Sequence, residues 1–143
     1  MTAAGATAEQ LPLPSTSFGD PAAIAEAVKA YLTEHADVDG ALTIGAGEAD
    51  AAAVGIEQAG KTGAVKLGSF DFNEATLDRI KGGTQAFAID QQPYLQAMLA
   101  VTLLAAHIDF GTDLPTAPVL TGPGIVDASN VDATIAGVQI GAR

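Results

Sequence analysis

Polar side chains follow the predicted strands of this 143-residue chain, at the points where the strands end. The segment Asp90-Gln91-Gln92-Pro93-Tyr94 comes directly after the apolar run 86–89 and opens a long apolar segment. Pro93 suits the first turn of a helix, where its missing N–H has no partner to lose. A buried strand that turns into a helix in this way places polar residues at the carboxyl edge of a sheet, where open α/β folds bind ligands.

Carboxyl groups follow two earlier predicted strands, so we expect them at the same edge. Carboxylates accept hydrogen bonds from neighbouring hydroxyls, amides donate and accept, and aromatic rings cover the apolar face of a sugar. These residue types predict a site for a neutral sugar or polyol. The alternative is that Asp71 and Gln91 only cap helices and turns. The candidate ligand-binding residues are Asp71, Gln91, Glu48, Asp50, Phe72, Asp90 and Tyr94.

Other chemistries fit these residues less well. The turn 45–47 follows a strand and opens a helix, as a dinucleotide-binding loop does, but Glu48 and Asp50 beside it would repel phosphate. Glycoside hydrolysis needs two carboxyl groups at a defined separation, which a sequence does not give. His35 and His107 lie far from the strand ends, and no spacing indicates a metal site. We therefore expect a binding protein that is not an enzyme, with no catalytic residue, metal or cofactor.

The elements that must position these residues alternate between strand and helix. This alternation predicts an α/β fold, with a three-layer parallel sheet, right-handed crossovers and helices on both faces. The expected elements are a helix from Asp20-Pro21 to near His35, a strand over 41–44, a helix over 48–58, a strand over 64–70, a helix from Asn73 to Lys81-Gly82, a strand over 85–89 and a helix over 93–108.

The two ends of the chain are less regular. Residues 1–10 are expected to be a disordered lead-in, and residues 11–143 a single lobe. Leu11-Pro12-Leu13-Pro14 suggests a short edge strand, because proline is tolerated only at edges. Short strands are also possible at 119–120 and 138–140. The helix over 93–108 is too short and too interrupted by polar groups to span a bilayer, so we expect it to be buried.

Composition narrows the class of partner. The net charge is −11, from six Lys and Arg against 17 acids. This charge argues against nucleic acid and anionic membrane, which both require a basic face. The chain has no cysteine, which excludes disulfides and thiolate metal sites. Residues 1–10 lack the basic and apolar regions of a signal peptide.

Four stretches together resemble the sugar-binding type I periplasmic binding proteins, of the ribose-binding and inositol-like class. They are HADVDGALTIG, GIEQAGKTGAVKLGSFDF, IKGGTQAFAIDQQPYLQAMLAV and LTGPGIVDASNVD, and they match the C-terminal lobe, a flavodoxin-like half of such proteins. The resemblance implies that Asp71 and Gln91 bind ligand. Gly45 stands where many members have a ligand-binding asparagine.

The resemblance also implies a role in sugar import by ABC transporters, with a permease as partner and a periplasmic or extracellular location. The lobe is expected to be truncated on its N-terminal side and cytoplasmic if that truncation is natural, since no signal peptide is seen. In the resembling proteins the sugar lies between two lobes, so one lobe alone should bind a monosaccharide or inositol-like ligand only weakly. Uncovered surfaces favour a homodimer, with exchange of residues 111–143 as one route. The alternative is a self-associating half-lobe with a structural role and vestigial ligand binding.

Overall fold

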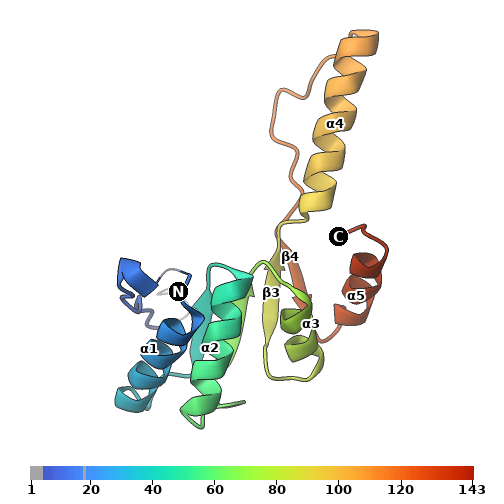
Figure 1. Cartoon of the computed structure of the whole chain (residues 1–143). Helices are drawn as coiled ribbons and strands as arrows, with labels where there is room; N and C mark the ends of the chain where they lie inside the picture. The colour runs from blue at the N-terminus through green and yellow to red at the C-terminus, as the bar shows by residue number, and fades with distance from the viewer. Residues whose placement is uncertain (1–4, 18) are drawn as a thin grey trace.

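The computed structural model describes residues 5–17 and 19–143 of the chain (Figure 1). Its centre is a four-stranded sheet in the order β1-β2-β3-β4. The first three strands are parallel, and the last is antiparallel to β3. The strands are β1 (Gly40–Thr43), β2 (Lys66–Phe70), β3 (Phe87–Asp90) and β4 (Gly124–Asp127).

The helices begin where the sequence provides caps. Asp20 accepts hydrogen bonds from the N–H groups of Ala22 and Ala23, and Pro21 occupies the first turn. Asn73 accepts from the N–H of Thr76 in the same way. The helices are α1 (Pro21–Glu34), α2 (Ala46–Gln58), α3 (Glu74–Lys81), α4 (Pro93–Phe110) and α5 (Val131–Gln139), preceded by a 3-10 turn at Ser15–Ser17.

One face of the sheet carries the hydrophobic core. A first cluster joins α1, α2 and β2 through Leu32, Ile56 and Leu67, and a second joins α3, β3, β4 and α5. The opposite face presents Leu42, Phe70 and Ile125 to solvent. The α/β fold class is confirmed, whereas helices cover only one face of the sheet in the described part of the chain, not both. Consecutive right-handed crossovers along one direction of a sheet put their helices on the same face, which explains this cover.

Helix α4 projects away from the sheet and its other helices (Figure 1). None of its residues is buried. Residues 111–123 run back along it to β4, and we call α4 together with this return segment the arm. The expectation of a buried helix here is wrong. By length and composition α4 could cross a membrane, the one helix among the described residues for which this holds.

Several details at the chain ends differ from the sequence-based expectations. Residues 11–14 form no strand, and β1 remains the edge strand of the sheet. Residues 119–120 are also irregular, and residues 138–140 close α5 instead of forming a strand. Residues 1–4 of the expected lead-in lie outside the described residues, and residues 6–10 adopt neither helix nor strand.

Candidate functional site

A cavity of about 590 Å³ opens at the carboxyl edge of the sheet, where β2 and β3 end. Its volume lies within the range of small-molecule sites. Four of the candidate residues named from the sequence share it. The lining residues are Asp71, Phe72, Asn73, Glu74, Asp90, Gln91, Pro93, Gln96, Val138 and Arg143.

Asp71 and Gln91 come from different strands and meet in this cavity. The side-chain amide of Gln91 donates to Asp71 Oδ1 over 2.7 Å. The backbone N–H of Asp71 donates to the carbonyl of Ile89 at 2.9 Å, which ties the ends of β2 and β3 together. The second carboxylate oxygen of Asp71 and the amide oxygen of Gln91 remain as acceptors for a ligand.

The backbone at this edge is held in an unusual conformation. Asp71 has φ 59° and Gln92 has φ 56°, and no other non-glycine residue in the described part of the chain has positive φ. Such residues are uncommon and cluster at ligand sites, where surrounding contacts maintain the strain. Here the Ser69 hydroxyl donates to the Asp71 carbonyl at 3.0 Å. The side chain of Gln92 donates to the carbonyl of Thr121, at the base of the arm.

Asp90 is the most deeply buried carboxylate at the cavity, with 2% of its surface exposed. Its Oδ1 accepts from the backbone N–H of Gln92 at 2.7 Å, which stabilises the turn into α4. Its Oδ2 has no hydrogen-bond donor and lies 3.3 Å from the Arg143 guanidinium. Burial of a carboxylate is tolerated when a cation compensates its charge, and Arg143 does so here.

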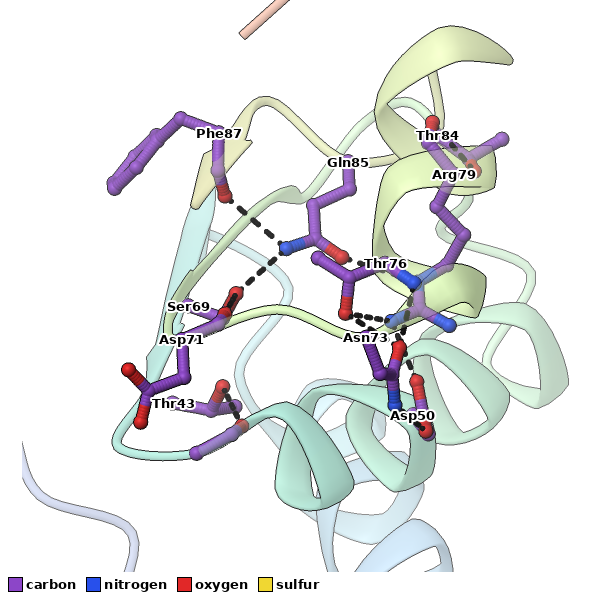
Figure 2. A network of polar contacts seen from close by, with 11 residues as sticks. Thr43, Asp50, Ser69, Asp71, Asn73, Thr76, Arg79, Thr84, Gln85 and Phe87 are labelled. Atoms are coloured by element: carbon purple, nitrogen blue, oxygen red, sulfur yellow. Dashed lines mark hydrogen bonds and ion pairs between the residues drawn. The ribbon is translucent and has the colours of Figure 1, made fainter. Parts of the chain in front are cut away.

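Asp50 belongs to a polar network that runs through Arg79, Gln85 and Ser69 to the backbone carbonyl of Asp71 (Figure 2). Its carboxylate pairs with Arg79 at 2.7 Å and accepts from the Asn73 side-chain amide at 2.7 Å. Figure 2 shows the Asp71 side chain pointing away from this network. The structure therefore places Asp50 in the contact between α2 and α3 and outside the cavity.

Glu48 and Tyr94 also lie outside the cavity lining. The Glu48 carboxylate folds back over Gly45, and a side chain at position 45 would require the flexible end of Glu48 to move aside. Tyr94 lies on α4 with half of its surface exposed.

Several lining or supporting residues escaped the sequence-based selection, among them Ser69, Asn73, Gln96 and Arg143. Ser69 is fully buried in β2, and its hydroxyl also accepts from Gln85 at 2.9 Å. A polar residue within an apolar strand was the available signal for Ser69. Asn73 was assigned only as a helix cap, although it also lines the cavity. Gln96 lies near the start of α4, a few residues after β3 ends, whereas Arg143 lies far along the chain, so only the folded structure brings Arg143 to the cavity.

Known proteins resemble the chain in both sequence and structure. Residues 7–113 match the periplasmic binding protein domain family. A xylose/arabinose-binding protein of Sulfolobus acidocaldarius is 29% identical over 110 residues, which cover 73% of this chain and 27% of that protein.

Two solved structures share the fold at substantial identity. A carbohydrate transporter from Acidothermus cellulolyticus in complex with myo-inositol has a TM-score of 0.75 and 34% identity, covering 87% of this chain and 43% of its own. An arabinose-binding protein from Geobacillus stearothermophilus has a TM-score of 0.71 and 28% identity, covering 82% and 42%. The chain thus spans less than half the length of these relatives. Because the family match extends over most of its residues, the chain belongs to the periplasmic binding protein domain family.

Proposed function

We propose that the chain supplies one half of a binding site for a neutral sugar or polyol, as the solute-binding component of ABC-type import. The observation that carries this proposal is the Asp71–Gln91 pair, hydrogen bonded at 2.7 Å in a cavity at the sheet edge. Backbone strain at Asp71 and Gln92 supports it, since such strain gathers at ligand sites.

The chemistry of the proposed site suits hydroxyl groups. Asp71 accepts from one or two neighbouring hydroxyls, and Gln91 can donate and accept. Phe72 offers a ring for the apolar face of a sugar. Asp90 sets the turn that positions Gln91. In this proposal the chain makes and breaks no bond, and a permease is the partner that receives the ligand outside the cytoplasm.

The ligand class comes from the site and from the relatives. The relatives include a protein in complex with myo-inositol and proteins described as binding arabinose or xylose. We propose a pentose, a hexose or an inositol. Because the cavity opens at the edge of a single sheet, the chain by itself covers a ligand on one side only. Affinity falls tenfold for each ~1.4 kcal/mol of lost contact, so we expect dissociation constants in the millimolar range.

An NMR titration of the ¹⁵N-labelled chain tests this proposal. Myo-inositol, D-xylose and L-arabinose should shift the backbone signals around residues 69–74 and 90–96 in wild type. The Asp71→Asn variant should bind at least about tenfold more weakly, because it loses a charge-assisted acceptor. Asp39→Asn is the matched control, since Asp39 is exposed at the opposite, amino edge of the sheet. Micromolar affinity, absence of any shift, or equal binding by the Asp71 variant would contradict the proposal.

A second candidate function is self-association through the arm. Helix α4 exposes an apolar stripe at the heptad-like spacing of a helix seam: Tyr94, Met98, Val101, Leu104 and Ile108. Val101 is 68% exposed and Ile108 is 70% exposed. Large contiguous apolar patches are rare on monomers and mark interaction sites. We propose a homodimer in which two arms pack together.

Sedimentation equilibrium measures this association directly. Wild type should dimerise, and Val101→Lys should shift it toward monomer by burying a charge in the seam. Ala30→Lys is the matched control, because it adds the same charge at an exposed position of α1. A wild-type monomer at high concentration, or a Val101→Lys variant that dimerises like wild type, would contradict arm pairing.

A further inference from the structure

The last residue of the chain reaches back into the cavity. After α5, Gly141 adopts φ 71° and the N–H of Ala142 donates to the carbonyl of Gly137 at 2.9 Å. This turn lays the methylene groups of Arg143 against Gly137, where an added Cβ would lie 3.3 Å from the Arg143 stem. Gly137 therefore leaves the space through which the Arg143 side chain passes.

Two buried groups hold the Arg143 guanidinium. Its Nη1 lies 3.3 Å from Asp90 Oδ2 and donates to Thr134 Oγ1 at 2.9 Å. Asp90 and Thr134 are each 2% exposed. An arginine side chain has high rotamer entropy, and holding it in one position requires contacts that offset this entropy. This side chain is fixed on one edge, while a third of it remains exposed and lines the cavity.

We infer that Arg143 is a ligand contact and a specificity-determining residue of the proposed site. Arginine has five N–H donors, and the Asp90 and Thr134 contacts both use Nη1. The remaining donors can bond a ligand hydroxyl, while Asp71 accepts from another. Asp90 and Thr134 are positioning residues that act through Arg143. This inference rests on the sugar-binding function proposed above.

The charges of the lining select a neutral ligand over an anionic one. Asp71, Glu74 and Asp90 contribute three carboxylates, and Arg143 is the one cation among the lining residues. Its charge is already compensated by Asp90. A ligand carboxylate would therefore meet the unpaired charges of Asp71 and Glu74. We expect D-glucose to bind wild type more tightly than D-glucuronate, which differs from it by one carboxylate.

The test is a ¹⁵N NMR titration with myo-inositol on wild type, Arg143→Met and Lys81→Met. Lys81 also pairs with an aspartate, Asp132, but lies outside the cavity lining, so its variant controls for the loss of one charge. We expect Arg143→Met to raise the dissociation constant about tenfold or more. Lys81→Met should bind like wild type.

Two milder variants keep the inference testable if Arg143→Met does not fold. Thr134→Val removes one anchor of the guanidinium and should weaken myo-inositol binding between about two- and tenfold. Arg143→Lys keeps the positive charge but lacks the planar set of guanidinium donors, so its dissociation constant should lie between those of wild type and Arg143→Met.

The possible results separate the inference from the proposed function. Wild-type affinity in the folded Arg143→Met variant, or in both milder variants, would overturn the inference and leave the proposed function standing. Equal loss in Lys81→Met would also overturn it, since net charge would then be the cause. Tighter binding of D-glucuronate than of D-glucose would overturn the neutral selectivity. If wild type binds no polyol at all, the proposed function fails and the inference fails with it.

Discussion

Asp50 and Asp71 are the same residue type in neighbouring parts of the fold, yet their surroundings differ. Asp50 is engaged by Arg79 and by the side-chain amide of Asn73, so it joins α2 to α3. Asp71 has Gln91 as its side-chain partner and lies at the cavity with one oxygen open. We therefore expect Asp50 to contribute to stability and Asp71 to contribute to ligand binding.

Urea unfolding separates these two roles. Asp50→Ala should lower the free energy of unfolding by about 1–2 kcal/mol, because it leaves Arg79 and Asn73 without their acceptor. Asp71→Asn should change it by less than about 0.5 kcal/mol, because asparagine tolerates the same positive φ and the site is open. The reverse order of the two values would show that Asp71 is a structural residue.

A glycine in β2 permits close packing on the open face of the sheet. A Cβ added at Gly68 would lie 2.5 Å from the ring of Phe87, which is too short for any contact. Gly68→Ala should therefore destabilise the chain by about 1–3 kcal/mol. Gly47→Ala is the control, because nothing lies within 4 Å of its added Cβ and alanine favours the helix. In a thermal unfolding experiment, Gly68→Ala should have a lower midpoint temperature than wild type, whereas Gly47→Ala should not.

How far the site could be predicted varies from residue to residue. Asp71 and Gln91 were predicted to lie together because the ends of parallel strands share an edge, and the structure places them in contact. Asp50 met the same criterion, but its contact with Arg79 depends on how α2 and α3 pack, which the sequence pattern does not encode. Arg143 reaches the cavity through a turn beyond α5, so nothing near it in the sequence indicated a site.

Among the elements, the turn between β4 and α5 contains a titratable carboxylate, that of Asp127. The hydroxyl and the backbone N–H of Ser129 donate to Asp127, at 2.6 and 2.8 Å, and these bonds lower the pKa of Asp127 below its ordinary value. A lowered pKa means that this contribution to stability is complete above pH 3.8 and is lost as the pH falls through the lowered pKa.

Ser129→Ala should raise the pKa of Asp127 toward its ordinary value, because the hydroxyl bond is lost while the backbone bond remains. Ser129→Thr retains a hydroxyl and should keep the pKa low. The pH dependence of the Asp127 side-chain NMR signals measures both. An unchanged pKa in the alanine variant would mean that the hydroxyl is not the main cause of the shift.

The elements that could not be predicted are those whose secondary structure or burial depends on contacts with other elements. The capped and periodic helices α1 and α3 were expected close to their observed bounds, since caps and spacing are local signals. Residues 11–14 have the composition of an edge strand, but they do not pair with the free edge of β1, and their local sequence does not encode that choice. Helix α4 is apolar all round, which predicts burial, yet among the described residues only the return segment 111–123 lies along it, and none of its residues is buried.

For the molecule as a whole, most of the negative charge lies outside the arm, while the arm exposes a large apolar surface. The arm contains Asp109 and Asp113 and no Lys or Arg, so its formal charge is −2 and that of the remaining residues is −9 (−11 minus −2). Repulsion between two lobes would therefore oppose arm pairing at low ionic strength. Salt screens such repulsion within about 10 Å at 0.1 M and about 30 Å at 0.01 M.

Raising the salt concentration from about 0.01 M to about 0.1 M should accordingly strengthen the proposed dimer. Sedimentation equilibrium at both concentrations measures the change. The Val101→Lys variant should stay more monomeric than wild type at both. Weaker association at the higher salt would mean that ion pairs, and not apolar contacts, join the copies.

Asp90 pairs with Gly124 across β3 and β4, so the chain leaves the sheet and re-enters it at adjacent points. In topological terms the whole arm is the loop of one β-hairpin, and the start of this loop supplies Pro93 and Gln96 to the cavity lining. A two-residue Asn-Gly link in place of residues 92–122 would close that hairpin without altering any other connection. Excision of the arm would thus give a minimal lobe that retains Asp71, Gln91 and Arg143 but lacks the Pro93 and Gln96 part of the cavity lining.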